Sequence, residues 1–272
     1  MVGKKNFVRL TVANFKRAIG FPFVVAVILV VCFLIFDVWS DFTTFFTTKQ
    51  GFSVWYFYFF SVVIMGTYSS NMLPLLAALP FSASYSEEQL AGITPLIVSR
   101  TSTKIYCISK ILVCAVTGGL TLAFGILLHT LLFSIQMPLL DGEALRQMKD
   151  LPYYTIFASG TGIGYFFIGA YLAFLRGAFF SAAAMTVSAY VCNKYVVIAS
   201  PFILNFILVR ACNIIQIPNQ YRFDMLLRGR TSIGTDSETL ILLTISVILL
   251  VLFCAFLFMR RVRRKIAYGS FT

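Results

Sequence analysis

Few side chains in the 272 residues have the types and spacing that catalysis requires. The single histidine, His129, lies near the expected outer end of an apolar segment, which favours an interfacial position over a catalytic one. No G-x-x-x-x-G-K-[ST] sequence that could cradle ATP phosphates occurs, and no H-E-x-x-H pair that could hold zinc. The six cysteines are scattered without the spacing of a metal site or a disulfide framework. We therefore expect no enzyme activity, no metal site and no cofactor bound by this chain.

Four polar side chains interrupt apolar stretches and are candidates for lining a pathway. Arg176 and Arg210 each lie 17 residues from Asn193, or about 25 Å along a helix, so they are expected at similar heights. The favoured interpretation is that both extend to the outer headgroups. The alternative is a basic ring at the mouth of a shared pathway. Asn71 and Asn205 lie near prolines, where bonding to a neighbouring helix is favoured over lining the pathway.

Composition decides what kind of fold must position these residues. Hydrophobic residues make up 59% of the chain and charged residues only 12%, whereas soluble domains average about 45–50% and about 25%. A soluble, disordered or disulfide-scaffold protein is thereby excluded, and an all-α integral membrane protein is predicted. The apolar runs are continuous, as in helices, and do not alternate as barrel strands do. Six spans are expected, at residues 20–36, 54–79, 105–133, 164–191, 195–212 and 240–259. The long stretch 140–163 leaves the start of the fourth span open.

The distribution of charge predicts the orientation. If both termini share one side, that side holds fourteen of the 22 basic residues. They are Lys4, Lys5, Arg9, Lys16, Arg17, Arg100, Lys104, Lys110, Lys194, Arg260, Arg261, Arg263, Arg264 and Lys265. Glu87 and Glu88 are the only acidic residues expected there. The positive-inside rule then places both termini in the cytoplasm of a cell-membrane protein. The basic residues flank spans and meet the lipid bilayer, and no nucleic-acid-binding motif accompanies them, so nucleic acid is not an expected partner.

Residues 1–19 are expected to form an amphipathic helix before the first span. At 100° per residue, Lys5, Arg9 and Lys16 lie on one side. The opposite arc is apolar and contains Phe7, Leu10, Phe15 and Ala18. Such a helix lies in the membrane interface. It serves either as a positive anchor that sets topology, the favoured interpretation, or as an elbow that steers the first span.

The loop at residues 82–100 is expected to contain a second short helix. Ser84 followed by Glu87 fits a capping box, which predicts a helix over 85–91. Gly92 can end that helix, and Pro95 cannot continue it. The third span has two candidate caps immediately before it, Thr101 and Ser102.

The loop and the segment after it carry a family resemblance. The string Glu87-x₄-Gly92-x₇-Arg100-Thr101-Ser102-x₃-Tyr106-x₂-Ser109-Lys110 resembles permease subunits of ABC-2 type ABC transporters. The stretch Asn193-Lys194-Tyr195-x₅-Pro201-Phe202 is similar to the turn before the fifth span of that family. The resemblance implies a six-span bacterial permease whose first cytoplasmic loop docks on a separate ATPase, which binds the ATP. It implies docking roles for Ser84, Glu87, Glu88, Gly92, Arg100 and Lys194.

The resemblance also implies a second permease, identical or related, that completes the pathway. Export of peptides, lipids or drugs, including antimicrobial-peptide export or immunity, is the function it implies. A stand-alone secondary transporter or channel is the first alternative, although such proteins generally carry buried acids, and here every acid lies in a loop or at a span edge. A membrane scaffold without transport is the second alternative.

Overall fold

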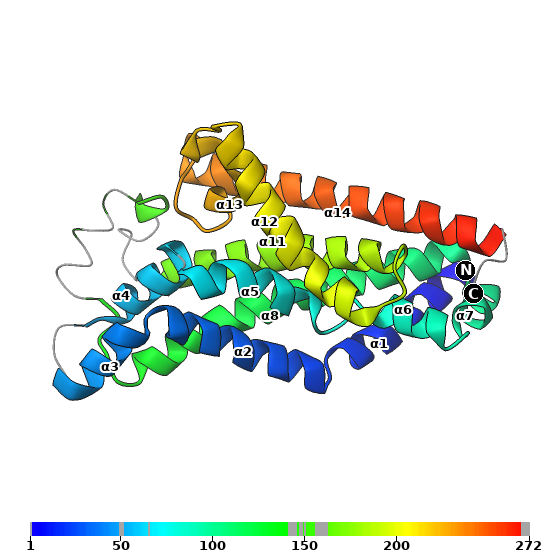
Figure 1. Cartoon of the computed structure of the whole chain (residues 1–272), viewed down its shortest axis with the longest axis horizontal. Coiled ribbons are helices and arrows are strands. Elements are labelled where there is room, and N and C mark those ends of the chain that lie inside the picture. Colours follow the sequence, from blue (N-terminus) through cyan, green and yellow to red (C-terminus); the bar gives the residue numbers. More distant parts are fainter. Residues whose placement is uncertain are drawn as a thin grey trace.

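The chain forms an elongated bundle of helices (Figure 1). This computed structural model describes residues 2–48, 52–64, 66–140, 151–155 and 163–267, together with Arg146 and Lys149. Within these residues there are helices and no strand. Helix α1 and the last turns of α14 lie at one end of the bundle, which we call the termini end (Figure 1). Four helices are long and apolar enough to cross a membrane, or up to six if each of two bent pairs counts as one span.

The four long helices lie where the last four spans were expected. They are α8 (Thr103–Ser134), α11 (Ile163–Ser188), α12 (Lys194–Ile214) and α14 (Asp236–Ala267). The fourth expected span therefore begins at residue 163 and ends three residues earlier than predicted. Helix α14 has 32 residues and is about 48 Å long, which exceeds the roughly 30 Å hydrocarbon core of a bilayer. Its basic last turns therefore extend past the apolar segment.

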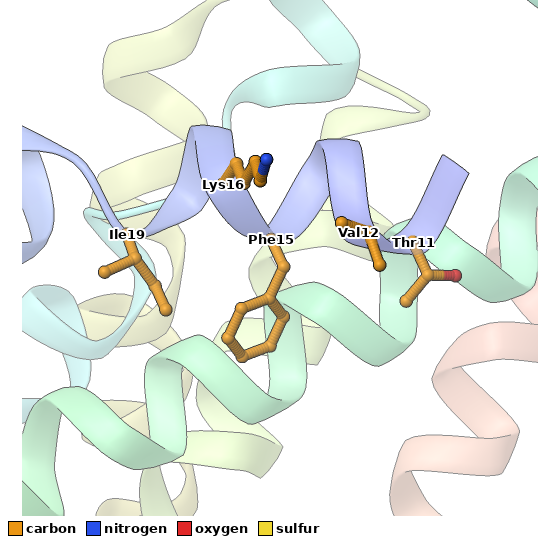
Figure 2. Close-up of a pocket in the computed structure, with 5 residues that line it drawn as sticks. All are labelled: Thr11, Val12, Phe15, Lys16 and Ile19. Atoms are coloured by element: carbon orange, nitrogen blue, oxygen red, sulfur yellow. The ribbon is translucent and has the colours of Figure 1, made fainter. Parts of the chain in front are cut away.

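The first bent pair joins α1 (Val2–Ala18) to α2 (Phe21–Asp37) at an angle of 52°. Pro22 occupies the first turn of α2, where its missing N–H costs no helical hydrogen bond. On α1, Ala18 is fully buried, while Phe15 and Ile19 point away from Lys16 and help line an apolar hollow of about 540 Å³ (Figure 2). Lys16 also contributes to the lining of this hollow, although its side chain leaves the helix on the other side from Phe15 (Figure 2).

The second expected span, 54–79, is not one continuous helix, which corrects the prediction. It consists of α4 (Val54–Tyr58), a π-helical segment η1 (Phe59–Ile64) and α5 (Thr67–Ala78), with a bend of 75° before α5. The carboxylate of Asp37 accepts hydrogen bonds from the backbone N–H groups of Tyr68 at 3.0 Å and Ser69 at 2.9 Å, and from the Ser69 hydroxyl. A side chain from α2 therefore satisfies the free N–H groups that a restarted helix exposes.

Helices α8 and α11 form the centre of the bundle. A Cβ atom at Gly177 on α11 would collide with the backbone oxygen of Gly118 on α8, so glycine is required for this close approach. One helical turn away, the Ser181 hydroxyl donates to the Cys114 carbonyl at 2.9 Å. His129 lies inside this core with 1% of its surface exposed and its ring 4.7 Å from Phe133. His129 therefore faces the interior of the bundle, near the end of α8, and its position relative to the membrane interface stays a prediction.

Short helices lie at both ends of the bundle. At the termini end lie α6 (Ser84–Leu90) and α7 (Thr94–Thr101). The opposite end carries α3 (Trp39–Thr48), the 3-10 turn η3 (Asn219–Tyr221) and α13 (Phe223–Leu226) (Figure 1).

Candidate docking site at the termini end

Helix α6 begins one residue earlier than expected and lacks the predicted cap. Ala83 precedes its first turn, and no side chain caps that end. Ser84 lies inside the helix, 4% exposed, and its hydroxyl accepts a hydrogen bond from the Lys110 Nζ at 3.2 Å. The capping-box prediction is wrong because Ser84 faces α8 and its oxygen is used between helices.

The end of α6 confirms the role predicted for Gly92. This residue has a φ of +67°, a left-handed conformation that glycine adopts without strain. The next N–H, of Ile93, donates back to the Glu88 carbonyl at 3.0 Å, which completes a Schellman motif. Pro95 does not continue α6, as predicted, and it occupies the first turn of a separate helix, α7, which the sequence analysis did not predict. The loop is therefore two helices joined by a tight turn.

Of the two candidate caps for the third span, Ser102 is the one used. Its hydroxyl oxygen accepts from the Ile105 N–H at 3.4 Å, whereas the Thr101 hydroxyl donates to the Ile97 carbonyl at 2.8 Å. Helix α8 thus starts directly after α7, which keeps the α6–α7 pair close to the bundle.

Glu88 is the centre of a buried ionic network. Its side chain is 7% exposed and lies 2.6 Å from the Nζ of Lys110, whose side chain is 1% exposed. The Tyr106 hydroxyl donates to its second oxygen at 2.7 Å. Arg17 of α1 reaches Glu88 at 2.8 Å with one guanidinium nitrogen and Glu87 at 2.8 Å with the other. The paired carboxylates therefore join α6 to α1 and α8.

Two further contacts extend this connection. The buried Lys265 Nζ, on α14, donates to the Gln89 side-chain oxygen at 2.9 Å. Asn14 on α1 donates to the Ser109 hydroxyl on α8 at 3.0 Å. Tyr85 of α6 is fully buried, and this burial raises the pKa of its hydroxyl well above the ordinary value. Helix α6 is thus fixed to α1, α8 and α14, the first, central and last long elements of the described chain.

The other side of this helix pair is exposed and apolar. Leu90 is 71% exposed, Ile93 44% and Leu96 63%. Glu87 of α6 and Arg100 of α7 are exposed charges of opposite sign on the same two helices. We call these five residues and Gly92 the α6–α7 surface.

The six residues that the resemblance implied for docking separate into three groups. Glu87, Gly92 and Arg100 are exposed on the α6–α7 surface. Ser84 and Glu88 are buried beneath it. Lys194 is exposed in the first turn of α12, with its ammonium 5.2 Å from the Tyr195 ring. The sequence analysis assigned Arg17 and Lys265 only to the charges that set topology, and it gave Lys110, which also ends the family string, no contact with Glu88. The sequence did contain one signal for this network. Tyr106 and Lys110 are four residues apart, so they place two polar groups on the same face of an apolar helix.

The pathway candidates occupy different environments. Arg176 is 4% exposed and donates to the backbone carbonyl of Ser70 at 3.0 Å. The buried Asn205 donates to the same oxygen at 3.1 Å. This carbonyl lies four residues before Pro74, which has no N–H to donate, so the two side chains replace the missing helical hydrogen bond. The favoured interpretation that Arg176 extends to the headgroups is therefore wrong. Its counterpart Arg210 is exposed.

Asn71, the remaining candidate, is half-buried on α5, one residue after the carbonyl that Arg176 and Asn205 share. No group of three or more His, Cys, Asp or Glu side chains that could hold a metal ion exists among the described residues. Comparison with known proteins found no match to a protein-family model, to a curated protein or to a solved structure.

Proposed function

We propose that this chain is the permease subunit of an ABC-2 type transporter, driven through the α6–α7 surface by separate ATPase subunits. The observation that supports this most is the two-sided construction of the α6–α7 pair. One side is bound to α8 and α14 by buried polar contacts and to α1 through the half-exposed Arg17, while the other exposes Leu90, Ile93 and Leu96. A soluble motor needs such an element, because force on a loosely held loop would not reach the spans.

The proposed topology has six spans and cytoplasmic termini. Helix α2 and the broken α4–α5 segment supply the first two spans, and the four long helices supply the rest. Helix α1 acts as an elbow in the cytoplasmic interface, with its apolar hollow against lipid. The termini end carries most of the basic residues, so the positive-inside rule favours this orientation.

The proposed assembly contains two ATPases and two permeases, the second permease being a copy of this chain or a relative. Peptides, lipids or drug-like molecules are the proposed exported substrates, with antimicrobial-peptide export or immunity as the proposed context in a bacterial plasma membrane. Arg210, Asn71, Arg176 and Asn205 remain proposed pathway residues. Because Arg176 and Asn205 bind a carbonyl in the closed core, they would line a pathway only when the bundle opens.

Co-purification tests the docking surface directly. The tagged chain is purified in detergent from cells that carry its native neighbouring reading frames, and the ABC ATPase retained with it is quantified. We expect Leu90→Asp and Leu96→Asp to reduce retention at least tenfold, because each places a charge in an apolar contact.

Ile135→Asp is the matched control, since Ile135 is 73% exposed directly after α8, at the opposite end from the docking surface. Thermal unfolding of each variant verifies that the fold is kept. Equal ATPase retention by all three variants would place the contact elsewhere. A wild-type chain that never retains an ATPase would contradict the proposed function itself.

A further inference from the structure

Helix α1 presents an apolar strip at the surface of the described chain. Val8, Val12 and Ile19, which directly follows the helix, are each about half exposed. At 100° per residue, these side chains and Phe15 fall within about 60° of each other. Val12, Phe15 and Ile19 also line the apolar hollow of about 540 Å³ (Figure 2). The strip therefore offers one continuous place where an apolar ligand can lie.

Contacts on the other side of α1 keep this strip facing outward. The Asn14 side chain and the Thr11 hydroxyl both donate to the Ser109 hydroxyl of α8, at 3.0 and 3.2 Å. Ala18 is fully buried on the same side of the helix. Because these contacts fix the rotation of α1 about its axis, the helix cannot turn its apolar strip into the bundle. The hollow is therefore a surface feature that a separate molecule can fill.

Two cations lie beside the strip. Arg9 and Lys16 are exposed, they fall within about 20° of each other around the helix, and Lys16 also lines the hollow. Neither forms an ion pair among the residues that the structure describes, whereas the adjacent Arg17 binds both Glu87 and Glu88. Those two carboxylates are thus already engaged, which leaves the positive charge beside the hollow available to an anion from outside the chain.

An apolar hollow beside two cations matches one class of ligand, a hydrocarbon chain with a negatively charged head. The hollow ends at Ile19, two residues before α2 begins, and at the start of α2 Phe21 is 81% exposed and Val24 54%. Acyl chains are expected around these side chains, because α2 belongs to an expected span. A phospholipid can therefore enter the hollow directly from the bilayer, whereas a soluble anion gains nothing from the apolar lining.

We propose that this hollow binds one anionic phospholipid of the cytoplasmic leaflet. An acyl chain lies along Val12 and Ile19, and the positive charges of Lys16 and Arg9 attract the headgroup. The site selects lipids by charge, which general contact with the bilayer would not do. This lipid site rests on the proposed function for the placement of α1 in the cytoplasmic interface, but it requires no ATPase.

Native mass spectrometry of the detergent-purified chain tests this site. The chain is titrated with phosphatidylglycerol, which is anionic, and separately with phosphatidylcholine of the same acyl chains, which is zwitterionic. Each cation close to a membrane surface strengthens the binding of anionic lipid about fivefold, so the first phosphatidylglycerol should bind about 25-fold tighter than the first phosphatidylcholine. Excess inorganic phosphate should not displace it, because phosphate lacks the acyl chain.

Arg9→Gln combined with Lys16→Gln should remove this preference, because both cations beside the hollow are lost. Arg263→Gln combined with Arg264→Gln is the matched control, since it removes the same charge from exposed residues of α14 at the same end of the bundle. This control should keep the preference. Val12→Asn should weaken the binding of both lipids equally, because Val12 contacts the acyl chain and not the headgroup.

Thermal unfolding verifies that each variant keeps its fold, which is expected because all five substituted side chains are exposed. The proposal is overturned by equal wild-type binding of the two lipids, by a preference that persists without Arg9 and Lys16, or by a preference lost in the α14 control. Unchanged lipid binding by Val12→Asn, or displacement by inorganic phosphate, would also overturn it. Because no ATPase takes part, these outcomes leave the proposed docking at the α6–α7 surface unaffected.

Discussion

The ionic network around Glu88 allows a quantitative prediction. Glu88→Gln keeps the shape of the side chain but leaves the ammonium of Lys110, 1% exposed, without its carboxylate partner. Removing one partner of a buried ion pair costs about 3–5 kcal/mol, because the remaining charge stays desolvated. For a chain of this length, we expect the melting temperature to fall by about 6–20 °C.

The double variant Glu88→Gln with Lys110→Met separates this cause from loss of shape. Methionine fills the site without a charge, so the double variant should be more stable than Glu88→Gln alone. A thiol-reactive fluorophore provides the assay, because Cys107, Cys114 and Cys254 are buried and react when the bundle opens. The reasoning is refuted if Glu88→Gln melts like the wild-type chain, or if the double variant gains nothing over it.

Three further substitutions test other contacts by the same thermal assay. Asp37→Ala should cost about 1–2 kcal/mol, since it removes the carboxylate that caps α5; a wild-type melting temperature would show that this cap is dispensable. Asn205→Leu should cost about 1 kcal/mol through its bond to the Ser70 carbonyl, and an increase in stability would contradict that role. Gly177→Ala should cost about 1–3 kcal/mol because its methyl group meets the backbone of Gly118, and unchanged melting would disprove this close approach.

The sequence was sufficient to locate the four long helices because their signal is local. Long apolar runs placed α8, α11, α12 and α14 within a few residues of their ends, apart from the extra charged turns of α14. Gly92 was recognised as a helix end because the required conformation depends on that residue alone.

The contacts between distant segments could not be read in the same way. The start of α5 is capped by Asp37, about 30 residues earlier in the chain, and the sequence showed this residue only as one of the acids in loops or at span edges. Ser84 had the type and spacing of a cap, but the nearby Lys110 attracts its hydroxyl into a contact between helices. Arg176 looked like a headgroup ligand because nothing local to it reveals the carbonyl that Pro74 leaves without a donor.

That carbonyl has a consequence for evolution. Pro74 creates the unsatisfied oxygen of Ser70, and Arg176 and Asn205 on two other helices compensate for it. Natural selection should therefore treat positions 74, 176 and 205 as one unit. In related sequences where position 74 is no longer proline, its N–H can bond the Ser70 carbonyl, so residues 176 and 205 can become apolar. In sequences that keep the proline, loss of the polar side chains at 176 and 205 should be rare.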